Sequence, residues 1–298
     1  MSGGARRIPR YTLHDGFRMP MGFPFAGFAS GQQYVPGPGD LFVSTYPKCG
    51  TTWMQYIVLL IRRRGRGLAA GETIDDVFPH LEEVGRETVT AMPPPRLIKT
   101  HLPFGRAPWS AAAKYVYVAR NPFDCAVSFY HHTRGFPRHY DFTDGTFDDF
   151  FECFIAGEVD FGDYFDHLLS WHPHTHEPNM LWVTYERMLE NPRGTVVRVG
   201  EFIGGPAAAA VRGSRVLDAI VAESSFARMS ETQSRWSSAR PADMPAFVRK
   251  GVAGDWRTHF SPRQAARLAA KFVERTRGTP CADLWSDQLT AALQYAAC

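Results

Sequence analysis

The stretch 44–53, STYPKCGTTW, places a lysine, a glycine and two threonines directly after a short apolar run. A nucleotide-triphosphate loop carries its lysine after its second glycine, whereas here Lys48 precedes Gly50 and the first glycine is missing. The backbone amides of Gly50, Thr51 and Thr52 would begin a helix, where they and the helix dipole attract an anion. The stretch therefore predicts a phosphate-binding loop of unusual order, with a plain strand–turn–helix connection as the alternative.

Two later segments also place cations directly after an extended run. In IKTHLPF (98–104), Lys99 and His101 alternate and can face one site, where a neutral histidine can take a proton from a hydroxyl. In YVYVARNPF (115–123), Arg120 ends the run, and a guanidinium suits a phosphate. Taken alone, either residue has a structural alternative, namely a hydrogen-bonded histidine and a surface arginine.

The same two runs end without the acidic residue that would hold Mg²⁺ in a phosphoryl-transfer enzyme. Basic strand ends instead suit the transfer of a less charged group without a metal, and sulfuryl transfer is such a reaction. The three histidines of WHPHTHEP (171–178) lack a Cys or carboxylate partner set, so we interpret them as a solvated loop.

Alternating strands and helices are expected to position these residues. This alternation predicts one α/β domain over 1–298, with a central, mostly parallel sheet flanked by helices and ligands bound beyond the carboxyl ends of the strands. Residues 1–40 are interpreted as an irregular arm and residues 231–250 as a lid. Strands are expected at 41–45, 96–100, 114–119 and 179–185, and helices at about 50–64, 122–134 and 193–203.

Composition bounds the class of protein. The chain has 298 residues, 44% of them hydrophobic, and a net charge of only +3, which does not indicate a nucleic-acid partner. Its five cysteines show no disulfide or zinc spacing, and its longest apolar run, 56–61, is far too short to cross a membrane. The start of the chain lacks the apolar stretch of a signal peptide. We therefore expect a cytoplasmic protein without a membrane partner.

Five segments, in order between about residues 40 and 260, resemble the cytosolic sulfotransferases, which use 3′-phosphoadenosine 5′-phosphosulfate (PAPS). That family has the loop T-Y-P-K-[ST]-G-T-T-W, a strand ending in Arg with a Ser eight residues later, and the signature R-K-G-x-x-G-D-W. Here 249–256 is RKGVAGDW. VTYERMLENP (183–192) and ESSFARM (223–229) are similar to two further family segments near the adenine nucleotide.

The resemblance implies a role for each matching residue. His101 would be the general base with Lys99 assisting, and Lys48 would stabilise the charge that develops on the leaving group, 3′-phosphoadenosine 5′-phosphate (PAP). No metal is implied. Thirteen further residues would contact PAPS: Cys49, Gly50, Thr51 and Thr52 at the 5′-phosphate, Arg120, Ser128, Arg249, Lys250 and Gly251 at the 3′-phosphate, and Trp53, Tyr185, Ser224 and Phe226 at the base.

The resemblance also implies an apolar acceptor pocket built from three segments, for a small hydroxylated aromatic or alcohol: a phenol, catecholamine, alcohol or steroid. The basic third segment, 131–142, favours a neutral or acidic phenol, whereas Asp141 and Asp144 would favour an amine-bearing one. Ordinary core packing is an equal alternative for the aromatic residues. The predicted pocket residues are Phe23, Phe25, Phe78, Phe136, His139 and Tyr140.

The chain departs from the family pattern at two places. Cys49 replaces the usual Ser or Thr, which leaves the control of Lys48 open and makes this thiol a possible oxidation site. SPRQAA (261–266) lacks the family's short dimerisation motif, so the usual homodimer is not predicted. The alternatives are a catalytically silent protein that binds PAPS or small amphiphiles, a metal-dependent nucleoside kinase and a membrane-anchored carbohydrate sulfotransferase.

Overall fold

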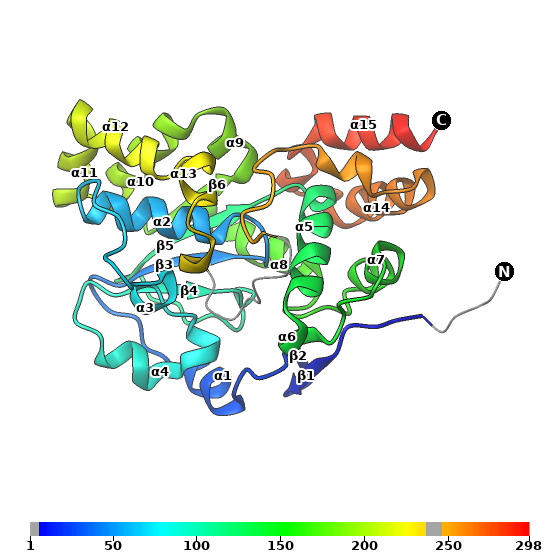
Figure 1. Cartoon of the computed structure of the whole chain (residues 1–298), viewed down its shortest axis with the longest axis horizontal. Helices are drawn as coiled ribbons and strands as arrows, with labels where there is room; N and C mark the ends of the chain where they lie inside the picture. Colours follow the sequence, from blue (N-terminus) through cyan, green and yellow to red (C-terminus); the bar gives the residue numbers. More distant parts are fainter. Residues whose placement is uncertain (1–5, 237–245, 298) are drawn as a thin grey trace.

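The computed structural model describes residues 6–236 and 246–297. Its centre is a parallel sheet in the order β4-β3-β5-β6, in which Val43 lies opposite Lys99 on one side and Val116 on the other (Figure 1). The predicted α/β fold with a central parallel sheet is confirmed. The strands are β3 (Leu41–Thr45), β4 (Leu97–Thr100), β5 (Lys114–Ala119) and β6 (Met180–Thr184).

Both faces of the sheet are buried because successive strand residues point to opposite sides. Val43 and Val116 pack into one apolar core, which a first group of four helices covers. Phe42 and Tyr117 pack into a second core, beneath α8 (Tyr164–Trp171). The first group consists of α2 (Thr51–Arg62), α10 (Pro192–Ile203), α11 (Gly205–Arg212) and α12 (Ser214–Glu223). The expected helices at 50–64 and 193–203 are α2 and α10.

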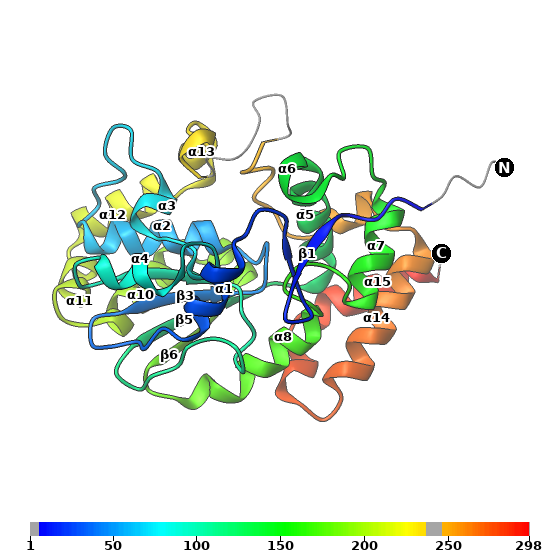
Figure 2. The same cartoon turned by 90° about the horizontal axis from the view of Figure 1, so that it is seen from below.

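A helical layer lies beside the sheet, on the right in Figures 1 and 2. Its helix α5 (Pro122–Gly135) follows β5 directly, as expected, and begins at a capped end: the side chain of Asn121 accepts a hydrogen bond from the amide of Asp124. Helix α5 therefore begins at the carboxyl end of β5. The other members of the layer are α7 (Phe147–Ala156), α14 (Pro262–Thr276) and α15 (Ser286–Ala296).

The prediction of an irregular N-terminal arm is wrong for much of 11–32. Strands β1 (Tyr11–His14) and β2 (Phe17–Pro20) form a hairpin, and α1 (Phe25–Gln32) packs against α4 (Leu81–Ala91). The turn is Asp15-Gly16, both at positive φ, which is a favoured two-residue hairpin turn. This Asp-Gly signal was present in the sequence.

Shorter helices and 3₁₀ turns connect the larger elements. They are α3 (Ile74–Val77), α6 (Pro137–Tyr140), α9 (Tyr185–Glu190), α13 (Phe226–Ser230), and the 3₁₀ turns at His172–His176, Gln233–Arg235, Asp255–Thr258 and Pro280–Asp283. The predicted lid, 231–250, lies partly outside the described residues, which stop at 236 and resume at 246. No helix in the described part of the chain is long and apolar enough to cross a membrane.

Candidate active site

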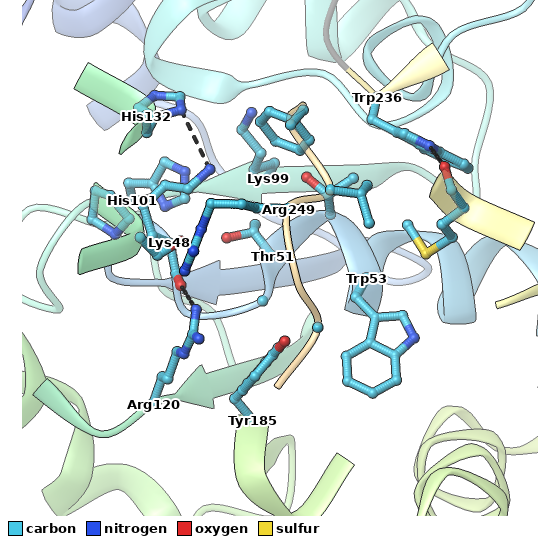
Figure 3. Close-up of a pocket in the computed structure, with 18 of the residues that line it drawn as sticks. Lys48, Thr51, Trp53, Lys99, His101, Arg120, His132, Tyr185, Trp236 and Arg249 are labelled. Atoms are coloured by element: carbon cyan, nitrogen blue, oxygen red, sulfur yellow. Dashed lines mark hydrogen bonds between the residues drawn. The ribbon is translucent and has the colours of Figure 1, made fainter. Parts of the chain in front are cut away.

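A cavity of about 460 Å³ opens beyond the carboxyl ends of β3, β4 and β5 (Figure 3). It is bounded by the residues that follow each of these strands and by the chain segments around residues 185, 226 and 250. Nineteen predicted site residues line it: Phe23, Lys48, Gly50, Thr51, Thr52, Trp53, Lys99, His101, Arg120, Ser128, Phe136, His139, Tyr140, Tyr185, Ser224, Phe226, Arg249, Lys250 and Gly251.

The loop after β3 begins α2 with a tightly packed glycine. Gly50 is the N-cap of α2 at φ 97°, and a Cβ there would lie 2.7 Å from the ring of Tyr185. Lys48 also has positive φ, which is uncommon for a residue with a side chain. The hydroxyl of Thr51 is fixed at 2.6 Å from that of Thr45. This conformation leaves the first amides of α2 at the cavity, where an anion can accept from them.

Arg120 provides a buried cation at the end of β5. Its side chain donates from Nη1 to the carbonyl of Lys48 at 3.2 Å and lies 4.2 Å from the ring centre of Tyr185. Its Nε has no hydrogen-bond partner among the described residues, although the residue is only 7% exposed. A buried donor without a partner is costly, so this guanidinium is suited to an anionic ligand.

Two further cations come from the segment after residue 246. Arg249 and Lys250 each lie 2.6 Å from Asp255, and their hydrogen bonds outweigh burial and lower the pKa of Asp255 to about 2. Gly251 follows at φ 64°, and a Cβ there would come within 2.3 Å of Phe226. The glycine therefore allows the backbone to approach the Phe226 ring closely.

Aromatic side chains line the cavity beside these cations. The indole Nε1 of Trp53 donates to the carbonyl of Ser224 at 2.8 Å, and its ring meets that of Tyr185 edge-to-face at 5.7 Å. Because the indole is fixed by this hydrogen bond, its orientation is set before a ligand binds. The flat apolar surface beside several cations is suited to a nucleotide base with its phosphates.

His101 is held in one tautomer. Its Nδ1 lies 2.8 Å from the backbone oxygen of Thr45, which only accepts, so Nδ1 carries the proton and Nε2 is left as an acceptor. Burial, followed by the nearby His80 and Lys99, lowers the pKa of His101 well below the usual value for histidine. A neutral imidazole with an accepting Nε2 at the cavity is able to take a proton from a hydroxyl group.

Glu82 holds the backbone around His101. One carboxylate oxygen accepts from the amides of His101 at 2.8 Å and Leu102 at 3.0 Å, and also from the hydroxyl of Thr100. The other oxygen lies 3.1 Å from Nε2 of His80. Burial raises the pKa of Glu82, but the opposing effect of His80 and these donors is larger, so the pKa is lowered and the carboxylate is ionised. No local sequence pattern marks Glu82, because its role depends on α4 meeting the end of β4.

Lys48 points into the centre of the cavity (Figure 3). Its Nζ lies 3.3 Å from Nδ1 of His132 on α5 and 4.2 Å from the ring centre of Phe247. Lys99 lies further out, with Nζ 4.0 Å from a carboxylate oxygen of Asp75. The two lysines and His101 therefore come from two adjacent strand ends, as predicted, and line one cavity.

A family model described as "Sulfotransferase domain" matches residues 38–280, which include the four strands of the sheet and all the predicted cavity-lining residues except Phe23. The chain belongs to the sulfotransferase family. Among its relatives, this sulfotransferase is 35% identical to rat sulfotransferase 1C2 over 83% of this chain and 86% of that protein. It is 36% identical to dog sulfotransferase 1A1 over the same shares of the two chains.

Solved structures agree with the fold of this sulfotransferase. Mouse sulfotransferase SULT7A1 complexed with PAP is 26% identical, with a TM-score of 0.71 over 98% of this chain and 99% of that one. Retinol dehydratase in complex with retinol and PAP has a TM-score of 0.76 over 91% of each chain, and at 23% identity it supports the fold alone.

Two predicted acceptor residues of this sulfotransferase do not line the cavity. Phe78 is fully buried in the core beneath α2, and the exposed ring of Phe25 packs edge-to-face on His14. The segment around residue 78 does reach the cavity, but through His80, which forms a parallel bridge with Lys99. Phe78 is the C-cap of α3, whereas His80 pairs with β4, so the two side chains lie on different sides although the residues are only two apart.

The side chain of Cys49 is also displaced from its predicted place. It is fully buried with Sγ 3.8 Å from that of Cys125, and it is not among the cavity-lining residues. Burial, and then the second thiol, raise its pKa well above the usual value for cysteine. A protonated, buried thiol is unreactive, which argues against the oxidation site considered from the sequence.

Several lining residues escaped the sequence analysis. Asp160 and Phe161 come from the loop between α7 and α8, and Trp236 and Phe247 flank the part that is not described. Nothing in their local sequence marks them, because their place depends on contacts between distant segments. In 6–236 and 246–297, no three His, Cys, Asp or Glu side chains gather as they would around a metal ion, and His172–His176 forms a 3₁₀ turn.

Proposed function

We propose that this sulfotransferase transfers a sulfuryl group from PAPS to a hydroxyl of a small acceptor, with His101 as the general base. When bound, PAPS supplies the sulfuryl group: its bond from sulfur to the phosphate oxygen is exchanged for a bond to the acceptor oxygen, and PAP remains. The observation that carries the proposal is the fixed tautomer of His101, with an accepting Nε2, beside Lys48 in one cavity.

The donor end of the cavity fits this nucleotide. Arg120 offers a buried Nε that has no partner in 6–236 or 246–297, and a side chain at Gly50 would collide with Tyr185 where α2 begins. We assign the 5′-phosphate to Gly50, Thr51 and Thr52, and the adenine to the wall of Trp53 and Tyr185. The 3′-phosphate would be held by Arg120, Ser128, Arg249, Lys250 and Gly251, and Ser224 and Phe226 would border the base.

The proposed roles at the reacting centre follow from charge. Lys48 would stabilise the negative charge that develops on the leaving phosphate oxygen. Nε2 of His101 would accept the acceptor's proton as that oxygen becomes a nucleophile, and the carbonyl of Thr45 would keep the ring oriented throughout. Lys99 would favour the neutral imidazole before the reaction.

The acceptor end is mixed in character. Phe23, Phe136 and Tyr140 offer apolar rings, while His80 and His139 offer polar edges. From these rings and polar edges we infer a small acceptor that combines an apolar body with a hydroxyl group. The cytoplasmic location and the absence of the usual homodimer stay predictions.

The test is incubation of the purified chain with PAPS and a panel of phenols, catecholamines, alcohols and steroids, in the presence of EDTA. We expect equal amounts of PAP and sulfated product with at least one acceptor. If PAPS binds with micromolar affinity and no acceptor in a broad panel is sulfated, the silent-binder alternative is favoured. If EDTA abolishes a reaction that Mg²⁺ restores, the proposed metal-independent transfer is wrong.

A further inference from the structure

Asp160 presents a buried carboxyl group to the cavity that the proposed reaction does not use. The residue is 1% exposed and lines the cavity. Its Oδ2 accepts a hydrogen bond from the hydroxyl of Tyr140 at 2.8 Å, whereas Oδ1 has no hydrogen-bond partner among the described residues. An unpaired buried carboxyl oxygen is destabilising, so a ligand that donates a hydrogen bond to it would be favoured.

The position of Asp160 places it near the proposed reacting centre. The next residue, Phe161, has its ring 5.2 Å from that of His101, and its amide donates to the carbonyl of Arg18 in β2 at 3.0 Å. Phe161 also has a φ of 63°, an uncommon conformation for a bulky residue. The hairpin therefore fixes the loop that carries the carboxyl group beside the base.

On its other side, Asp160 is connected to Lys48 through aromatic residues. Tyr140, which donates to the carboxyl group, lies 5.8 Å ring to ring from His132, whose Nδ1 is 3.3 Å from Nζ of Lys48. Burial raises the pKa of Asp160 to about 7, while Tyr140 and Lys48 act in the opposite direction. Asp160 thus lies between the His101 and Lys48 sides of the cavity.

We propose that Asp160 is a specificity-determining residue that recognises a second hydroxyl group on the acceptor, so that dihydroxy acceptors are preferred to matched monohydroxy ones. This inference rests on the proposed function. A neutral donor is favoured over an ammonium group because the site is buried and Lys48 would repel a second cation. A monohydroxy acceptor would leave Oδ1 of Asp160 unpaired.

The test compares phenol with the three dihydroxybenzenes, catechol, resorcinol and hydroquinone, and with tyramine as the amine-bearing analogue. The readout is the ratio of kcat/KM for each compound to that for phenol, so a general change in activity cancels. We expect at least one dihydroxy isomer to exceed phenol by about tenfold or more, as for a hydrogen bond to a carboxylate. Equal values for all four, or a preference for tyramine alone, would overturn the inference.

Asp160→Asn assigns the preference to this side chain. Its amide oxygen can still accept from Tyr140, but its NH₂ then faces the position of Oδ1 and can only donate. The hydrogen bond from the second hydroxyl to a carboxylate is thereby replaced by a weaker neutral one, so the dihydroxy preference should fall below about threefold. Tyr11→Phe is the matched control, because Tyr11 is a half-buried neighbour whose ring lies 5.9 Å from that of Tyr140 and which does not line the cavity. It should keep the wild-type ratio. A preference that survives in Asp160→Asn contradicts the assignment.

Two outcomes separate this inference from the proposed function. If phenol and the diols are all sulfated at equal rates, only the role of Asp160 is wrong. If neither these compounds nor any acceptor of the broad panel is sulfated, the proposed function fails, and calorimetric binding of phenol and the diols to the PAP complex of the wild type still decides the diol preference. The wild-type comparison also stands if Asp160→Asn does not fold.

Discussion

The ring of His101 donates from Nδ1 to the backbone oxygen of Thr45, 2.8 Å away, and so joins the end of β4 to the end of β3. Thr45 in turn contacts Thr51, the first residue of α2, through paired hydroxyls. The proposed base and the phosphate loop are therefore oriented by the same residue. A shift of one would move the other, which gives the site a rigid core between two parallel strands.

The pH dependence of kcat/KM for a monohydroxy acceptor, which has no second hydroxyl for Asp160 to bind, should reflect the environment of His101. Burial, His80 and Lys99 lower its pKa well below 6.5, so the base stays neutral as pH falls past the range in which a free histidine is protonated. The acidic limb of the profile should accordingly lie below pH 6.5. Lys99→Met removes a cation and raises the pKa, so the limb should move to higher pH.

Lys114→Met is the control for this shift, because Lys114 lies at the opposite end of β5, where it donates to the carbonyls of Phe202 and Ile203. The acidic limb of the kcat/KM profile of Lys114→Met should coincide with that of the wild type. An acidic limb at or above pH 6.5 in the wild type, or no movement in Lys99→Met, would mean that the titrating group is not His101 in this environment.

Arg120 should be responsible for recognising the 3′-phosphate. In the wild type, PAP should bind about ten- to a hundredfold more tightly than 5′-AMP, which lacks that phosphate, as expected for charge-assisted hydrogen bonds. Arg120→Met should weaken PAP binding until the two ligands are nearly equal, with little effect on 5′-AMP. Isothermal calorimetry measures both.

The exposed Arg187, paired with Glu190 on α9, provides a matched arginine outside the cavity. Arg187→Met should retain the wild-type difference between PAP and 5′-AMP. If Arg120→Met weakens both ligands equally, Arg120 supports the loop through the carbonyl of Lys48 instead of contacting the 3′-phosphate.

Gly50→Ala should damage both binding and stability. The new methyl group would lie 2.7 Å from the ring of Tyr185, and alanine disfavours a φ of 97°. We expect a loss of at least about 1 kcal/mol in the free energy of unfolding, and at least tenfold weaker PAP binding. Gly105→Ala is the comparison, since nothing lies within 4 Å of a Cβ there. Equal effects of the two substitutions in urea titrations and calorimetry would refute the role of Gly50.

Cys49 should resist alkylation in the folded protein. Its thiol is fully buried against Cys125, and burial keeps its pKa high. Iodoacetamide at pH 8 should leave Cys49 unmodified until urea is added, as peptide mass spectrometry can measure. Rapid native modification of Cys49, accompanied by loss of activity, would restore the idea of a reactive thiol in the phosphate loop.

The sheet and the donor end of the site could be predicted because their signals are local. Apolar runs ending in Lys, His or Arg mark β3, β4 and β5, and the ends of parallel strands must meet at one edge of the sheet. The N-terminal hairpin was missed although Asp15-Gly16 is a local turn signal. Residues 1–40 are rich in Gly, Pro and Phe and show no helical period, a composition that favours the interpretation as an irregular arm.

The acceptor end could not be predicted in the same way. Phe78 and His80 lie in one segment, and only the tertiary contacts of α3 and β4 decide that Phe78 enters the core while His80 lines the cavity. Asp160 has no local signal at all. Its burial depends on Tyr140 and on a hairpin more than a hundred residues away. No local sequence pattern could therefore predict that the carboxyl group of Asp160 lines the cavity.

The most direct test of the central claim compares wild type and His101→Ala in the presence of PAPS and an accepted phenol, with sulfated product measured by mass spectrometry and PAP affinity by calorimetry. The wild type should form one sulfated product per PAP released. His101→Ala should lose about a hundredfold or more of its turnover and keep PAP affinity within about threefold. Transfer at the wild-type rate by His101→Ala would contradict the assignment of the base, and the absence of any sulfated product from the wild type would contradict the proposed reaction.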